Sequence, residues 1–181
     1  EEQKYEPLKF EKTIKIVNLS FKYDKGLPNT LNKFSFNIIK GEKVVIKGQT
    51  GSGKSTLVNI ISGLLNPSEG KILVDDTYIN SENLKHWQKN LAIVPQTVFL
   101  NDATVLENIA IALNVSSIDV EKAKNSAKIA QIDTFIESLP NKYNEKVGER
   151  GVRLSGGQRQ RIGIARALYR DAKVIILDEP T

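Results

Sequence analysis

Nine consecutive residues combine glycines, one lysine and several hydroxyl side chains. They fit the pattern G-x-x-x-x-G-K-[ST] without a mismatch, as Gly48-Gln49-Thr50-Gly51-Ser52-Gly53-Lys54-Ser55-Thr56. Glycines let successive backbone N–H groups turn toward phosphate oxygens, Lys54 supplies a cation, and the Ser55 hydroxyl is a donor suited to Mg²⁺. The pattern predicts a loop that binds nucleotide phosphates. The alternative is a glycine-rich turn that contains a lysine by chance.

A second glycine-containing run comes late in the chain and precedes a predicted helix that extends from about Gln158 to Tyr169. It reads Leu154-Ser155-Gly156-Gly157-Gln158. A serine and two glycines at a helix N-terminus form a cradle of hydroxyl and N–H groups for an anion. One nucleotide needs only one phosphate loop, so a second cradle indicates a second ligand. For this run taken alone, a plain helix cap is the alternative.

Two adjacent carboxylates follow an apolar run, Val174 to Leu177, which is predicted to be a strand. Asp178 and Glu179 point to opposite sides of an extended backbone and can therefore have different roles. Solvent-facing turn residues are the alternative interpretation for this pair.

Further elements must position these groups. An antiparallel β layer is predicted over residues 13–39, with a break at 25–28, and buried strands are predicted over 42–47, 71–75 and 91–94. A helix is predicted from Lys54 to about Leu65. Thr104 and Glu107 form a capping-box pattern that begins a helix to Leu113, and helices are also predicted over 119–132 and 133–139.

The order of these motifs resembles that of ATP-binding cassette (ABC) proteins, in which an LSGGQ signature precedes an apolar strand and two carboxylates. The resemblance runs from about Thr13 to the end of the chain. It implies an α/β fold with a P-loop NTPase (RecA-like) core, an N-terminal antiparallel β layer, and a helical insert over about residues 97–157. It also implies that the C-terminal part of the cassette is missing.

The resemblance implies ATP and Mg²⁺ as ligands and gives the residues roles. Asp178 would hold Mg²⁺ through water, with Ser55 as a further ligand, and Glu179 would polarise the attacking water. Gln96 resembles the Q-loop glutamine that reaches Mg²⁺ and that water, and it joins Lys54 and Glu179 in the catalytic set. Tyr23 lies where the family has an aromatic residue stacked on adenine; the alternative is an ordinary strand aromatic.

The family also implies partners. The signature of one cassette closes on the γ-phosphate held by another, so two cassettes enclose two ATP molecules head to tail. Val147 to Gly151 resembles the x-loop of exporters. A transmembrane partner is therefore expected near Gln96–Asn108 and Val147–Gly151, at the cytoplasmic face of the cell (inner) membrane, with residues 1–12 as the linker from it. Trp87 and residues 94–102 look similar to cassettes of lipid-linked oligosaccharide flippases.

Three departures from the family pattern stand out. Lys47 occupies a strand position that is usually apolar, and Pro180 stands where many exporters have alanine. The D-loop and the switch histidine, which follow the catalytic glutamate in the family, are not in the sequence. His86 precedes Gln96, so it is predicted to be a surface or packing residue.

Composition narrows the class of protein. The 181 residues are 40% hydrophobic, enough for one α/β domain, and no apolar run approaches the ~18 residues needed to span a bilayer. The net charge of +5 is spread among acidic residues, so no nucleic acid is expected, and the absence of cysteine excludes disulfides and thiolate metal sites.

The sequence therefore predicts an ATPase whose ATP-driven dimerisation powers an exporter-like membrane transporter. One alternative is a soluble ABC ATPase of DNA repair or translation, which would show a tandem cassette, a coiled-coil insert or a basic arm. The other is a regulatory module that binds ATP without hydrolysing it. Retention of Lys54, Gln96, Asp178 and Glu179 argues against that module.

Overall fold

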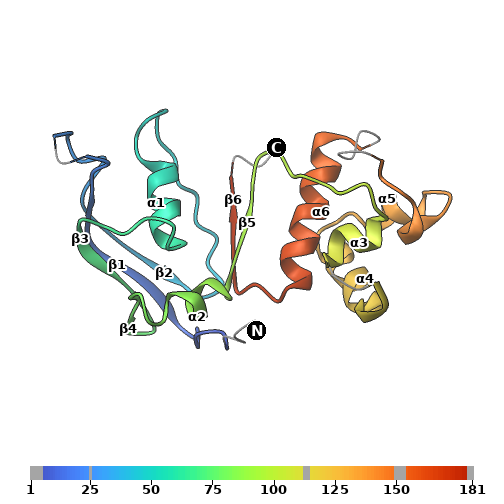
Figure 1. Ribbon diagram of the computed structural model, residues 1–181, viewed down its shortest axis with the longest axis horizontal. Coiled ribbons are helices and arrows are strands. Elements are labelled where there is room, and N and C mark those ends of the chain that lie inside the picture. Colours follow the sequence, from blue (N-terminus) through green and yellow to red (C-terminus); the bar gives the residue numbers. More distant parts are fainter. Residues whose placement is uncertain (1–5, 25, 112–114, 149–153, 179–181) are drawn as a thin grey trace. The chain divides into compact units, whose positions relative to one another are not determined.

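The chain folds as two compact units, residues 1–91 and 92–181. The computed structural model describes residues 6–24, 26–111, 115–148 and 154–178. Strands and helices occur in both units, which confirms the predicted α/β class (Figure 1). None of the described helices combines the length and the apolar character that crossing a bilayer requires.

An antiparallel sheet forms the first unit. Its strands are β1 (Thr13–Phe21), β2 (Leu31–Ile39), β3 (Glu69–Val74) and β4 (Thr77–Tyr78), in the order β2-β1-β3-β4. Alternate residues of β1 are buried, and their partners on β3 are buried as well: Ile14 pairs with Val74 and Ile16 with Ile72. The period-two apolar pattern of the sequence therefore sets the register. The predicted N-terminal β layer is confirmed.

The turn between β3 and β4 anchors the chain that enters the sheet. Asp75 and Asp76 both have positive φ, 46° and 68°, as in a two-residue type I′ hairpin. The Asp75 carboxylate accepts hydrogen bonds from the backbone N–H of Glu11 and from those of Lys12 and Thr13, the latter two at 2.8 Å. One side chain therefore fixes the start of β1 to the hairpin.

Helices α1 (Lys54–Ile61) and α2 (Leu84–Gln88) complete the first unit. The fully buried Trp87 of α2 donates from Nε1 to Ile61 O at 2.8 Å, and its ring meets Phe10 edge-on with the ring centroids 6.3 Å apart. His86 Nδ1 donates to Glu6 O at 2.7 Å. His86 is thus a packing residue, and residues 6–10 lie against α2.

One expected strand is absent. Residues 42–47 belong to neither sheet of the described chain, and the side chains of Val45 and Ile46 are 74% and 45% exposed. The sequence prediction for this segment was wrong for this structure. The apolar run supplies the propensity, but a strand also needs a hydrogen-bonded neighbour, which this segment lacks within the described residues.

The second unit contains a two-stranded sheet and a group of helices (Figure 1). The strands are β5 (Leu91–Val94) and β6 (Val174–Leu177), with the bounds that the sequence predicts. The helices are α3 (Val105–Ala110), α4 (Val120–Ile129), α5 (Asp133–Glu137) and α6 (Gly156–Tyr169), with 3-10 turns η1 (Val115–Ser117) and η2 (Lys142–Asn144).

The predicted capping box at the start of α3 is confirmed. Thr104 Oγ1 accepts from Glu107 N at 3.2 Å, and Glu107 Oε2 accepts from Thr104 N at 2.8 Å. Hydrogen bonds from the Thr104 hydroxyl and then from its N–H lower the pKa of Glu107. The helix ends earlier than predicted because Ile111 adopts a left-handed conformation with φ 42°, and residues 112–114 lie outside the described chain.

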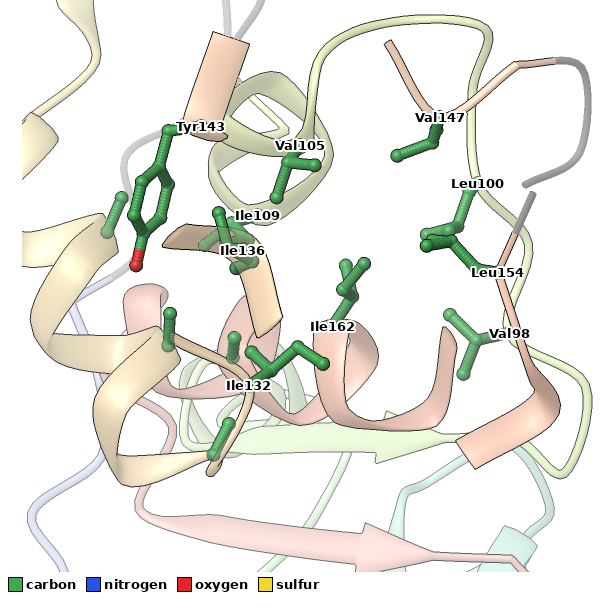
Figure 2. Packing of buried hydrophobic residues seen from close by; sticks show 14 of the residues in the cluster. Val98, Leu100, Val105, Ile109, Ile132, Ile136, Tyr143, Val147, Leu154 and Ile162 are labelled. Atoms are coloured by element: carbon green, nitrogen blue, oxygen red, sulfur yellow. The ribbon is translucent and has the colours of Figure 1, made fainter. Parts of the chain in front are cut away.

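Helix α6 lies at the centre of the buried core of the second unit. Ile162 on α6 points toward Val98 and Leu154 (Figure 2), and all three belong to one apolar cluster. Where α4 meets α6, both helices carry buried alanines, such as Ala123 and Ala165. Small residues at these positions let the two helices approach closely.

We expect Asp75→Asn to lower the free energy of unfolding by about 1–2 kcal/mol at neutral pH, because the substituted amide loses one acceptor oxygen for the Glu11–Thr13 amides. Burial acts to raise the pKa of Asp75, but the N–H donors of Thr13, Glu11 and Lys12 outweigh it and hold the pKa below 3.8. The stability that the Asp75 carboxylate contributes is therefore fully present above about pH 4 and is lost as the pH falls through the lowered pKa.

Thermal unfolding of the wild type and the variant between pH 2 and pH 7 measures this difference. Asp76→Asn is the matched control, because Asp76 sits in the same turn and makes only an exposed ion pair with Lys15. If the difference in unfolding free energy between wild type and Asp75→Asn stays constant down to pH 2, the carboxylate does not have this role.

Candidate functional site

The predicted phosphate loop connects the segment after residue 47 to α1. Gly51 and Gly53 have φ of 81° and 91°, a region that favours glycine. A β-carbon on Gly53 would lie 3.0 Å from both Leu31 Cδ2 and Thr30 O, and one on Gly48 would lie 2.5 Å from Ser52 Oγ. Backbone conformation therefore requires glycine at positions 51 and 53, and at Gly48 a larger residue would displace the Ser52 hydroxyl.

Lys54 is held over this loop. Its Nζ donates to Gly48 O at 2.8 Å and to Gln49 O at 2.9 Å, and Ser52 N closes the turn onto Gln49 O at 3.1 Å. The ammonium is therefore fixed at the mouth of the loop, where an anion bound by the loop amides would meet it.

The N-terminus of α1 has no cap of its own. The N-cap residue Gly53 offers no side-chain acceptor, and the first turn contains no acidic residue. The side chains of Thr104, Asp119 and Ser155, by contrast, cap α3, α4 and α6. The first N–H groups of a helix have no partner within the helix, so those of α1 are left for an external acceptor.

Tyr23 lies beside the phosphate loop. Its hydroxyl shares a hydrogen bond of 2.9 Å with Thr56 Oγ1 in the first turn of α1, and its ring meets Phe21 edge-on with the ring centroids 4.9 Å apart. The side chain is 61% exposed. The first unit thus brings together the predicted adenine-stacking residue and the phosphate loop.

Gln96 and Asp178 lie at one edge of the β5–β6 pair. Asp178 N donates to Val94 O at 3.0 Å, so the last residues of the two strands meet, and the two strands point the same way in Figure 2. Gln96 follows Val94 by two residues, and both Gln96 and Asp178 are exposed. The predicted catalytic carboxylate, Glu179, lies outside the described residues.

The predicted signature forms the start of α6. Ser155 is the N-cap: its Oγ accepts from Gln158 N at 3.2 Å, and its N–H donates to Gln158 Oε1 at 2.8 Å. Arg159 Nη1 donates to Leu154 O at 2.7 Å. Among the described residues, a β-carbon on Gly156 or Gly157 would meet no atom of another part of the chain within 4 Å. The glycines therefore leave open space at a helix N-terminus.

Two residues of α6 that sequence reasoning missed contact the chain next to Gln96. A β-carbon on Gly163 would lie 2.8 Å from Val98 Cγ2, and Arg166 Nη1 donates to Phe99 O at 3.2 Å. A signal for Gly163 was present, because an isolated glycine inside a helix often marks close packing. The local pattern gave no signal for the carbonyl partner of Arg166.

Comparison with known proteins identifies the family. The profile of the ABC transporter family matches residues 31–181. The ATP-dependent lipid A-core flippase of Chromohalobacter salexigens is 38% identical over the whole chain, which covers 31% of that protein. The ABC transporter B family member 29 of Arabidopsis thaliana is 39% identical over 93% of the chain and 26% of its own length.

A solved structure gives the same result. The structure of a bacterial Atm1-family ABC exporter with ATP bound matches with a TM-score of 0.83 and 34% identity, over 98% of this chain and 31% of that one. The chain thus spans about a third or less of the length of the relatives named here. The predicted family is confirmed: the chain belongs to the ABC transporter family, as a nucleotide-binding domain similar to those of exporters.

Proposed function

We propose that this domain binds and hydrolyses ATP and thereby powers an exporter-like membrane transporter. The observation that carries the proposal is the uncapped N-terminus of α1, to which the Gly48–Thr56 loop adds the positioned ammonium of Lys54. Backbone N–H groups and a cation that converge on one point suit the β- and γ-phosphates. Beside them, the exposed ring of Tyr23 offers a face for the adenine.

Each unit offers donors of the kind that Mg²⁺ takes. Ser55 in the first unit has a hydroxyl oxygen, Gln96 and Asp178 in the second have amide and carboxylate oxygens, and all three side chains are exposed. When bound, Mg²⁺ would neutralise phosphate charge. Glu179 would accept a proton from the attacking water in an in-line transfer of the phosphoryl group, as the sequence predicts. The exposed side-chain oxygens of Gln96, after β5, and of Asp178, after β6, support the assignment of Mg²⁺ binding to these two residues.

The glycines of the signature support dimerisation. Glycine inside a helix costs about 1 kcal/mol relative to alanine, and neither packing nor positive φ requires Gly156 or Gly157 here. Their value lies in exposing the first amides of α6 to a group from outside the chain. We infer that this group is the γ-phosphate held by a second cassette, so that the two domains close head to tail around two ATP molecules.

The transmembrane partner is inferred from two segments that meet. Val147 N donates to Ala103 O at 3.2 Å, and Val105 N donates to Glu145 O at 3.0 Å. The two regions in which a partner is expected, Gln96–Asn108 and Val147–Gly151, are therefore joined by backbone hydrogen bonds, although Val105 and Val147 themselves are buried. The relatives are named flippase, transporter and exporter. Those names favour a membrane transporter over a soluble ATPase of DNA repair or translation, and we infer that the domain works at the cytoplasmic face of the membrane.

Lys54→Ala is expected to weaken MgATP binding by about 10- to 100-fold, because the loop loses a charge-assisted contact worth about 1.5–3 kcal/mol. Titration calorimetry on the native protein measures it. Lys43→Ala, which removes an exposed lysine outside the loop, is the control and should bind normally. Equal affinities for wild type and Lys54→Ala would show that the loop does not hold the phosphates.

Glu179→Gln is expected to lower the rate of ATP hydrolysis by about 10²–10⁴-fold, since the amide keeps the size of the side chain but cannot accept the proton. ATP affinity should stay within about twofold of wild type, because general bases act on the reaction step. Phosphate release and nucleotide binding are measured side by side. Retained turnover would place the base elsewhere, and Gln96 would be tested next.

Ser155→Arg, placed in the Glu179→Gln background, is expected to abolish the ATP-dependent dimer, because a long cation would fill the open space above Gly156 and Gly157. Analytical ultracentrifugation with and without MgATP reports the dimer. Thr134→Arg adds the same charge at an exposed position of α5 and should leave the dimer intact. An unchanged dimer in Ser155→Arg would refute the role of the signature.

A further inference from the structure

Helix α6 holds the chain on both sides of Gln96. Gly163 packs so closely that a β-carbon there would lie 3.0 Å from Val94 Cγ1 and 2.8 Å from Val98 Cγ2. Val94 and Val98 are both buried and stand two residues before and two residues after Gln96. Helix α6 therefore packs against the chain both just before and just after Gln96.

Arg166, one turn further along α6, holds the same segment by hydrogen bonds. Its Nε donates to Asn108 O at 3.0 Å and its Nη1 to Phe99 O at 3.2 Å. Burial, together with the nearby charge of Arg170, lowers the pKa of Arg166. A half-buried guanidinium that donates to two carbonyl groups fixes the distance between them, because its fork of donors is rigid.

The fully buried Asn108 extends this connection. Its Oδ1 accepts from Asn101 N at 2.9 Å, and its Nδ2 donates to Asn101 O at 3.1 Å and to Thr104 O at 3.0 Å. The backbone from Phe99 to Thr104 is thereby attached to α3 and, through Arg166, to α6. The segment that follows Gln96 is thus attached to α6.

We propose that Gly163 and Arg166 are positioning residues for ATP hydrolysis, which place Gln96 beside Asp178 from the helix that carries the signature. This inference rests on the proposed function. Because Val94 also accepts a hydrogen bond from Asp178 N, two of the three predicted Mg²⁺ ligands, Gln96 and Asp178, follow strand ends that meet at Val94. A small displacement of residues 98–99 would move Gln96 away from the reacting atoms without touching the phosphate loop.

The test compares single and double variants of the native protein. Arg166→Gln and Gly163→Ala should each lower kcat by about 10- to 100-fold, the effect of a misplacement near 1 Å, while ATP affinity stays within about twofold. In a Gln96→Ala background neither change should lower kcat further, because residues that act through one group are not additive. If Gly163 and Arg166 only stabilise the fold, their substitution should instead lower the midpoint of thermal unfolding, and the losses of kcat should add to that of Gln96→Ala.

Two matched variants serve as controls. Arg161→Gln removes a guanidinium from the same helix whose Nη1 donates to Gln131 O, away from Gln96, and should keep the full rate. Val98→Ala in the Gly163→Ala chain removes the closest of the clashing methyl groups, while Val94 Cγ1 remains at 3.0 Å, and should raise kcat above that of Gly163→Ala. The comparison of Gly163→Ala with the Gly163→Ala/Val98→Ala double variant tests the positioning role even if Arg166→Gln does not fold.

The possible results separate two kinds of failure. Unchanged kcat in Arg166→Gln and Gly163→Ala, or losses that add fully to that of Gln96→Ala, would overturn the positioning role while leaving the ATPase assignment intact. A full rate in Gln96→Ala would remove the role of Gln96 and overturn this inference with it. Failure of the wild type to hydrolyse ATP would overturn the proposed function itself.

Discussion

The arrangement of the second unit depends on how closely α6 approaches β5. At Gly163 there is no room for a methyl group between the helix and two valines, Val94 at the end of β5 and Val98 four residues later. Interiors packed to this density transmit a shift of one element to its neighbours. The same helix buries Ile162 in the apolar cluster and has Ser155 as its N-cap. One close contact therefore determines where the signature, the edge of β5 and the segment after it stand relative to one another.

The helix termini show how the chain treats its unpaired N–H groups. At Thr104, Asp119 and Ser155 a side chain accepts from the first turn, which stabilises the helix. At Gly53 none does, and the backbone there adopts a conformation that a side chain would strain. Leaving a helix N-terminus uncapped costs stability unless a ligand supplies the acceptor. The short helices α2 and α5 also lack a side-chain cap, but among the described helices of eight or more residues only α1 does, and it is the helix that follows the predicted phosphate loop.

Features that depend on near neighbours were readable from the sequence. The capping box of Thr104 and Glu107, the glycines of the phosphate loop and the bounds of β5 and β6 all follow from spacing along the chain. Features that depend on a partner far away in the sequence could not be predicted from it. Residues 42–47 have a strand composition but no paired neighbour among the described residues, and the Asp75 carboxylate reaches amides more than sixty positions away. Periodicity carries no information about such partners.

Phe99 joins the proposed chemistry to the proposed partner surface. Its carbonyl oxygen is held by Arg166, while its ring is 62% exposed in the segment where a transmembrane partner is expected. A force on that ring would act on a backbone three residues from Gln96 and bonded to α6. Coupling between two sites requires a physical element that both of them contact. The segment from Gln96 to Thr104 meets that requirement, because hydrogen bonds attach it to α3 and α6 and it carries the exposed aromatic side chain of Phe99.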